Sequence, residues 1–560
     1  MVAERILTGY LSKTIIILQK TGGGNDYQIM IVSSPLKTEN KRMKMKFKVI
    51  IGVFAGLITL QQSSAQEKRM VLKPEIMKEE VNYFNSLDSE DVKNAISNEK
   101  TYEFLAQQIP LFNCPDSAIQ KIYYYRWWTL RKHLKDTPDG FVFTEFLTPM
   151  KHGGKYNAIS SAVGLQLNEA RWFYNPEIAK QYANFWLNVD SKEKNPHLHN
   201  FSNWFAWSML DIYKVDHDIN FIERNIQALN LDYQKWEKER QLKDGSFWQY
   251  DVKDAMEESI SGGRREKNVR PTINSYMYGS AKAMVTMAGL AGIDSLKNKY
   301  QLKANELKSI VENRLWNEKN SFFEVEKEKG GLANAREAIG FLPWYFNLPA
   351  DDKKYQKAWH QLTDEAGFCA PWGITTAERR HPEFRTHGSG RGCEWDGAVW
   401  PYATTQTLTA LSNFINNYKN HDDMNDEIFY KEFHKYAMSH VINGNRTYIG
   451  EYQDEKNGNW LKGDIPRSRF YNHSSYVDLV ISDLVGLKPQ IDNTLIIQPL
   501  IPQNKWDWFC LDGVKYHGQL LTVIWDKTGK KYGKGKGFLV FKNGERIYKS
   551  RKLKNIKTPL

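Results

Sequence analysis

The sequence predicts a mainly α protein in which a closed double ring of helices, an (α/α)6 toroid or six-hairpin barrel, carries a small antiparallel β domain at its carboxyl end. Three observations support this prediction. Helical patterns separated by loops follow one another from residue 116 to residue 487. This stretch has neither βαβ alternation nor a fixed repeat length, which argues against a parallel sheet and against a helical solenoid. Patterns typical of strands begin only after residue 487.

The chain of 560 residues divides into segments of different character. The β domain contains Asn543-Gly544, a dipeptide typical of a tight hairpin turn. The expected segments are a mis-called start at residues 1–42, a signal peptide at 43–65, an N-terminal helical lead-in at 66–115, the toroid at 116–487, the β domain at 488–548 and a basic tail at 549–560.

Residues 43–66 have the composition of a secretory signal peptide. Lys44, Lys46 and Lys48 precede an apolar run, and Ser63–Ala65 are small residues suited to cleavage. The apolar run is short for a membrane span. We therefore expect a secreted or periplasmic protein that has no membrane contact after cleavage. An uncleaved membrane anchor is the alternative.

The net charge of +12 is unevenly distributed along the chain. Residues 1–65 hold nine Lys and Arg against three Asp and Glu, and residues 527–560 hold twelve against one. The body between them is slightly acidic, which argues against nucleic-acid binding by that body. Aromatic residues make up 13% of the sequence, and such an excess is typical both of sugar-stacking clefts and of helical cores.

The four cysteines (Cys114, Cys369, Cys393 and Cys510) are widely separated and show no metal-ligand spacing. Cys369 and Cys393 are the closest pair, and a disulfide between them is one possibility in an exported chain. We expect neither a metal nor a cofactor, because the motifs of kinases, nucleotide-binding proteins and zinc hydrolases are absent. The sequence does not indicate an oligomeric state.

The candidate chemistry is centred on the acidic stretch 251–258. A carboxyl group that is buried against aromatic rings can remain protonated near pH 7 and donate its proton, as acid catalysis on a sugar requires. A solvated loop that caps the next helix is the alternative. The carboxylates are Asp251, Asp254, Glu257 and Glu258, and an aromatic turn containing Trp248 precedes them.

Three other polar and aromatic stretches, 390–404, 448–460 and 467–478, lie where a loop meets a helix, and functional residues are often found at such junctions on helical scaffolds. Arg264 follows the acidic stretch and either contacts the substrate or balances the nearby carboxylates. For Trp395 and Trp400, core packing is the alternative to cleft lining. The expected substrate-binding residues are Trp248, Arg264, Trp372, Trp395, Asp396, Trp400 and Tyr452.

Five motifs occur in a defined order over residues 255–485. They are AMEES followed by NSYMYGSAKAM, then LWNEKNSFFEV, GFLPWYFNLP, CAPWGITTAERRHPEF followed by EWDGAVWPYAT, and GEYQDEKNGNW. Their joint order resembles that of the (α/α)6-barrel glycoside hydrolases of the trehalase, glucosidase I and mannosylglycerate hydrolase group. The C-terminal β domain is similar to the sheets that six-hairpin glycosidases carry.

This resemblance implies roles for individual residues. Glu257 stands where the group has its general acid and Glu451 where it has its general base, which implies an inverting hydrolase with roughly 6.5–9.5 Å between the two carboxyls. Because the group has Asp at the position of Glu257, Glu258 and Asp254 stay open as alternative acids. Asp396 replaces the Arg of the Y-W-R-G motif, and we interpret it as an acceptor for a sugar hydroxyl, with a catalytic role as the alternative.

The sequence therefore predicts an exo-acting glycoside hydrolase, an α-glycosidase by the resemblance, whose partner is an oligosaccharide or polysaccharide. One alternative is a polysaccharide lyase or unsaturated-uronyl hydrolase on a similar toroid, to which His152, Lys155 and Arg264 could contribute. A non-catalytic glycan-binding protein is the other.

Overall fold

The computed structural model describes residues 10–11, 14–20, 27–33, 71–387, 392–421 and 423–560. The predicted signal peptide lies outside the described residues. The chain divides into two compact units, Met1–Ser63 and Ser64–Leu560. The first contains an antiparallel sheet of β1 (Tyr10–Leu11), β2 (Thr14–Lys20) and β3 (Tyr27–Ser33). All functional residues discussed below belong to the second unit.

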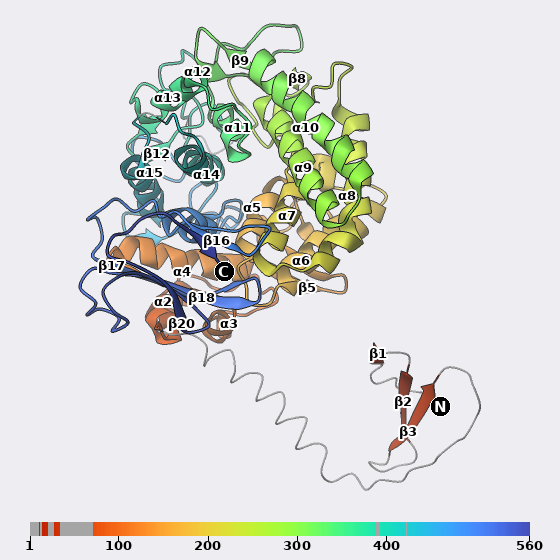
Figure 1. Cartoon of the computed structure of the whole chain (residues 1–560). Helices are drawn as coiled ribbons and strands as arrows, with labels where there is room; N and C mark the ends of the chain where they lie inside the picture. Colours follow the sequence, from red (N-terminus) through yellow and green to blue (C-terminus); the bar gives the residue numbers. More distant parts are fainter. Residues whose placement is uncertain (1–9, 12–13, 21–26, 34–70, 388–391, 422) are drawn as a thin grey trace. The chain divides into compact units, whose positions relative to one another are not determined.

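In the described part of the second unit, six helices form an inner ring and pack on one another in chain order, and the last helix returns to pack on the first. Figure 1 labels α5, α7, α9, α11 and α14 of this ring. Their side chains are largely buried, because the ring is enclosed on all sides. The inner helices are α5 (Val163–Ala170), α7 (Phe205–Asp216), α9 (Pro271–Leu290), α11 (Leu342–Tyr345), α14 (Pro401–Asn417) and α16 (Tyr476–Asp478), which the π-helical turn η10 (Leu479–Leu484) continues.

Outer helices alternate with the inner ones along the chain and bury one face each. The face of α8, for example, buries apolar side chains spaced three or four residues apart, as an amphipathic helix requires. The alternation of inner and outer helices confirms the predicted (α/α)6 toroid. The outer helices are α4 (Ser117–Lys132), α6 (Glu177–Asn184), α8 (Ile219–Arg240), α10 (Asp294–Arg314), α12 (Lys353–Gln356) with η9 (Lys357–Trp359) and α13 (His360–Thr363), and α15 (Asp426–Met438).

Short hairpins and single helical turns make up much of the connecting loops. The hairpins pair β5 (Leu134–Thr137) with β6 (Gly140–Phe143), β7 (Trp248–Gln249) with β8 (Asn268–Val269), β9 (Trp316–Asn317) with β10 (Phe322–Phe323), β11 (Cys369–Ala370) with β12 (Gly373–Ile374), and β13 (Val441–Ile442) with β14 (Arg446–Thr447). The turns are η2 (Lys155–Asn157), η3 (Ser160–Ala162), η4 (Phe185–Val189), η5 (Asp190–Lys192), η6 (Leu198–Asn200), η7 (Asp251–Lys253) and η8 (Ala338–Phe341).

The C-terminal β domain contains two antiparallel sheets. One has the strand order β20-β19-β18-β17-β4 and the other β15-β16-β21. Asn543 and Gly544 join β19 to β20 with φ values of 49° and 90°, as the predicted hairpin turn requires. The strands are β15 (Leu487–Lys488), β16 (Thr494–Ile497), β17 (Trp508–Tyr516), β18 (Gln519–Asp526), β19 (Gly537–Lys542), β20 (Glu545–Ser550) and β21 (Ile556–Pro559).

Two expectations about the ends of this unit need correction. The lead-in at 66–115 is helical only in η1 (Pro74–Met77), α2 (Lys78–Ser86) and α3 (Thr101–Gln108); its β4 (Leu111–Asn113) pairs with β17. Residues 549–560 are not a free tail, because β21 pairs with β16 along its whole length. Both segments are ordered by strand partners far away in the sequence, which local composition does not reveal.

The four cysteines are free thiols, so Cys369 and Cys393 form no disulfide. Over the described ranges, no helix combines the length and apolar character needed to cross a membrane. The same residues include no cluster of three or more His, Cys, Asp or Glu side chains suited to a metal ion.

Candidate active site

The candidate residues lie in the loops that precede the inner helices. The acidic loop 251–270 leads into α9, the segment 392–400 into α14, and the loop 448–475 into α16. Because inner helices follow one another through antiparallel outer helices, all six begin at the same end of the barrel. Residues far apart in the sequence therefore meet there, where the amino ends of the helices also favour negative charge.

Glu257 is half-buried in the acidic loop. Its neighbours Ala255 and Glu258 both have left-handed backbone conformations, with φ of 59° and 66°. Such conformations are uncommon for residues other than glycine and often occur at functional sites. Burial, reinforced by the negative charge of Glu451, raises the pKa of Glu257 to about 7, against the opposing effect of Arg264. Glu257 can therefore hold a proton near neutral pH.

Glu451 is only 3% exposed. Burial raises the pKa of its carboxyl, whereas the positive charges of Arg467 and Lys462 lower it. Its Oε1 lies 3.9 Å from Sγ of Cys393, and its Oε2 has no hydrogen-bond partner within the described part of the chain. A buried carboxylate oxygen without a protein partner is available to a water molecule or a substrate hydroxyl.

Cys393 connects the two carboxyls electrostatically. Burial raises the pKa of its thiol, and the charges of Glu257 and Glu451 raise it further. Both carboxyls thus act on the same thiol, although the three groups come from the loops before α9, α14 and α16. The structure brings together the two residues that the sequence singled out as acid and base.

The two alternative acids have different environments. Asp254 is buried and forms an ion pair with Arg270, with Oδ2 2.6 Å from Nε and both side chains fully buried. It also accepts a hydrogen bond from Thr272 at the start of α9. The ion pair and the hydrogen bond tie the acidic loop to the start of α9, which is a structural role. Glu258 is half-buried, and its carboxylate packs directly against Gly392.

Asp396 is buried and held by an arginine. Its Oδ2 lies 2.9 Å from Nε and 2.8 Å from Nη2 of Arg385, and 3.5 Å from Nε2 of His387. Its Oδ1 has no partner among the described residues. The arginine fixes one carboxylate oxygen in place and leaves the other without a partner in the part of the chain that the structure describes, as a fixed hydrogen-bond acceptor requires.

The expectation that Trp395, Trp400 and Tyr452 line the cleft needs correction. The rings of Trp395 and Trp400 stack 4.4 Å apart, and those of Trp400 and Tyr452 stack 4.5 Å apart. Trp395 and Trp400 are each 3% exposed and Tyr452 is fully buried, so none has a free face for a sugar. The stack instead packs Trp395 and Trp400 against Tyr452, which is adjacent to Glu451 in its loop.

The remaining predicted binding residues are accessible to different degrees. Trp248 is half-buried, and Arg240 and Lys267 lie 4.8 and 5.0 Å from the centre of its ring. Trp372 is also half-buried and packs against Gly458 of the loop that carries Glu451. Arg264 is exposed. The structure thus brings Trp372 to the base-bearing loop and leaves Trp248 on β7 beside the acidic loop.

Glu145 is a further carboxyl of the site that sequence reasoning did not identify. It lies before α5, accepts a hydrogen bond from Ser161 at 2.5 Å, and accepts another from Tyr471. Burial raises its pKa to about 7, and the charges of Glu451 and Glu257 contribute to the rise. The only signal in the sequence was a carboxyl in a polar loop before a helix, the same context that drew attention to Glu257 and Glu451.

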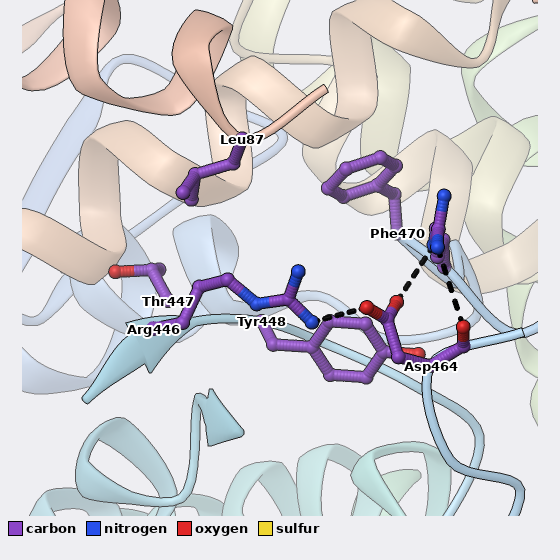
Figure 2. Close-up of a pocket in the computed structure, with 7 residues that line it drawn as sticks. Leu87, Arg446, Thr447, Tyr448, Asp464 and Phe470 are labelled. Atoms are coloured by element: carbon purple, nitrogen blue, oxygen red, sulfur yellow. Dashed lines mark hydrogen bonds and ion pairs between the residues drawn. The ribbon is translucent and has the colours of Figure 1, made fainter. Parts of the chain in front are cut away.

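Asp464 fixes the two ends of the loop that carries Glu451 (Figure 2). Its carboxylate accepts a hydrogen bond from Arg446 at the start of the loop and another, 2.7 Å long, from Nε of Arg469 near the end. The phenol of Tyr448 donates to the carbonyl oxygen of Gly463 at 2.9 Å. These bonds tie the base-bearing loop back on itself beside a pocket that Leu87 and Phe470 also line.

The fold and the paired carboxyls define a helical-barrel enzyme that acts on glycosidic bonds. The model of the mannosylglycerate hydrolase MGH1-like glycoside hydrolase domain matches residues 155–474. This match covers more than half of the chain, so the protein belongs to that glycoside hydrolase family. The model of the C-terminal domain of glycosyl hydrolase family 65 matches residues 488–547.

Solved structures with a similar fold include longer proteins. One named sialidase is 48% identical, with a TM-score of 0.85 over 88% of this chain and 45% of its own. The α-L-rhamnosidase from Dictyoglumus thermophilum is 14% identical, with a TM-score of 0.52 over 80% of this chain and 49% of its own, and shows the fold alone. An uncharacterized protein of Borreliella burgdorferi is 21% identical over 207 residues, which are 37% of this chain and 42% of that protein. The chain spans less than half the length of these proteins.

Proposed function

We propose that the protein is an exported, inverting glycoside hydrolase that removes sugars from the ends of oligosaccharides, as an α-glycosidase. The observation that carries this proposal is the pair Glu257 and Glu451. Glu257 has a pKa of about 7 and can hold a proton, whereas burial raises the pKa of Glu451 and the two cations Arg467 and Lys462 oppose that rise. An inverting hydrolase needs this division of roles between two carboxyls.

In the proposed reaction the protonated carboxyl of Glu257 donates its proton to the glycosidic oxygen. The ionised carboxyl of Glu451 accepts a proton from a water molecule, which attacks the anomeric carbon from the opposite face of the sugar. Arg467 and Lys462 favour the negative charge that Glu451 needs before the attack. After one turnover Glu257 is ionised and Glu451 is protonated, and exchange with solvent restores both groups.

The test uses the purified full chain and the variants Glu257→Gln and Glu451→Gln. The substrates are α-linked oligosaccharides, plant cell-wall fragments and a sialoside, the last because the relative named sialidase is 48% identical. Proton NMR from the first minutes follows the anomer released. We expect an inverted anomer from the wild type and loss of hydrolysis in both variants.

Three results would contradict this proposal. Release of the retained anomer would indicate that Glu451 acts as a nucleophile and not as the base that activates water. An unsaturated product that absorbs in the near ultraviolet would indicate a polysaccharide lyase. Binding of a glycan without turnover by the wild type would indicate a glycan-binding protein.

A further inference from the structure

One end of the five-stranded sheet gathers exposed cations. Strand register places the start of β17 beside the end of β18, the end of β18 beside the start of β19, and the start of β19 beside the end of β20. The segments attached to these strand ends therefore lie together, and we call them the basic sheet end. Its nine exposed cations are Lys505, Lys527, Lys530, Lys531, Lys534, Lys536, Arg551, Lys552 and Lys554.

Few acidic groups balance this charge. Asp507 is exposed and pairs with Lys527 at 2.8 Å. Within the described residues, none of the other eight cations forms an ion pair with an acidic side chain. Glu545 is also exposed, but it follows the β19–β20 turn at the opposite end of the sheet. Clustered like charges repel one another, and an anionic partner would relieve this repulsion.

The cations are presented by a structured loop beside aromatic rings. Asp526 is buried and accepts hydrogen bonds from the backbone N–H groups of Gly529 at 2.7 Å and Tyr532 at 3.0 Å, which fix the path of the loop 527–536. The ammonium group of Lys531 lies 3.9 Å from the centre of the Trp508 ring, which in turn packs edge-on against Tyr532. A cation beside half-buried aromatic rings can bind both the carboxylate and the apolar face of a sugar.

The basic sheet end is separate from the candidate active site. Trp506 donates a hydrogen bond to the phenol of Tyr430 at 3.2 Å, and Lys505 lies 4.9 Å from the centre of the same ring. Tyr430 lies near the start of α15, an outer helix. Outer helices begin at the end of the barrel opposite the one where the inner helices begin, so a ligand here would leave the catalytic loops accessible.

We propose that the basic sheet end is a docking surface for an acidic polysaccharide, a polymer in which uronate carboxylates follow one another along the chain. The family membership of the catalytic barrel favours a carbohydrate partner over a nucleic acid or a membrane. Lysine outnumbers arginine eight to one in this cluster. A lysine ammonium group can bind a carboxylate in many orientations, which suits a flexible polymer that binds in several registers. Docking would keep the enzyme near its substrates by raising their effective concentration.

The test measures binding of the full-length protein to polygalacturonate and to the same polymer with fully methyl-esterified carboxyls, by affinity electrophoresis and calorimetry. We expect binding to the charged polymer alone, with an affinity that falls about tenfold or more between roughly 50 and 200 mM NaCl. The triple variant Lys531→Glu, Lys534→Glu and Lys536→Glu should lose at least about tenfold in affinity. These side chains are exposed, so the variant is expected to fold.

A second triple variant separates local docking from net charge. Lys238→Glu, Lys297→Glu and Lys353→Glu changes the net charge equally, at exposed positions on α8, α10 and α12. It should bind polygalacturonate like the wild type. Equal loss in both triple variants, or equal binding to the esterified polymer, would overturn the proposal. Tighter binding to duplex DNA or to vesicles with anionic lipids than to polygalacturonate would also overturn it and assign the surface to that partner.

Discussion

The carboxyl group of Glu145 accepts a hydrogen bond from the phenol of Tyr471, and this bond joins the loop before the first inner helix to the loop before the last. The backbone N–H of Asn472 also donates to the carbonyl oxygen of Glu145 at 3.1 Å. The contact therefore lies at the seam where α5 and α16 close the ring. It also places a third carboxyl in the electrostatic field of Glu257 and Glu451.

Glu145→Gln is expected to shift the pH dependence of hydrolysis. Removing a carboxyl that repels the charged forms of Glu257 and Glu451 should lower the pKa of both, so the basic limb of kcat/KM should move to lower pH. The amide keeps the size of the side chain and can still bond to Ser161 or Tyr471. Glu324→Gln changes another buried glutamate, which bonds to Asn317 and Asn320 outside the site, and it should leave the limbs in place. Unchanged limbs in Glu145→Gln would show that Glu145 is structural.

The same variant should change how stability depends on pH. The pKa of Glu145 is raised from 4.5 to about 7 in the folded protein, so the folded state binds more protons than the unfolded state between these values. Stability therefore decreases as pH rises through this range, by up to about 3 kcal/mol from this group. Between pH 5 and 8, the melting temperature should fall less steeply with rising pH in Glu145→Gln than in the wild type. Equal slopes would contradict the raised pKa.

The pH profile should identify the general acid. Glu257 acts in its protonated form, so kcat/KM should fall as pH rises above about 7. Glu257→Gln should reduce hydrolysis of unactivated glycosides by about 10²–10⁴-fold and abolish the fall of kcat/KM at high pH. It should retain more activity on aryl glycosides, whose leaving group needs no proton. Glu451→Gln should be inactive on both substrates. If Glu258→Gln, and not Glu257→Gln, removes the basic limb, the acid is Glu258.

Asp254→Asn tests the assignment of Asp254 to the fold. The change leaves Arg270 charged and unpaired in a fully buried position, which costs about 3–5 kcal/mol. We expect a fall of several degrees in melting temperature. The matched control is Glu326→Gln, which removes a partly exposed partner of Arg314 and should cost about 1 kcal/mol or less. A stable Asp254→Asn protein without activity would restore Asp254 as a candidate acid.

Asp464→Asn should loosen the loop that carries Glu451. The amide carries no charge and cannot satisfy both Arg446 and Arg469. We expect kcat to fall by about tenfold or more, because displacing a catalytic group by about 1 Å can cost as much as 10²-fold in rate. Limited proteolysis between residues 446 and 469 should become faster. Asp507→Asn breaks a more exposed ion pair, with Lys527 in the β domain, and should change neither measurement. Normal kcat in Asp464→Asn would show that the loop is held by other contacts.

The sequence by itself determined the fold class, and it proposed Glu257 and Glu451 as the acid and the base. Helical periodicity without strand alternation is a local property, and so is a cluster of acidic residues in a loop before a helix, so both can be read along the chain. The order of motifs around Glu257 and Glu451 added the family. The aromatic pattern at Trp395 and Trp400, in contrast, is compatible with either a cleft wall or a core, because it does not show which side of a ring is covered.

Only the tertiary structure decided which residues meet. Glu145 joins the site because the ring closes at α5 and α16, and Asp254 is held in a buried ion pair because Arg270 lies against it. Residues 556–559 of the expected basic tail become a strand because β16 offers them an edge. In each case the deciding interaction joins residues that no local pattern relates, since burial and charge pairing depend on the partner that folding brings into contact.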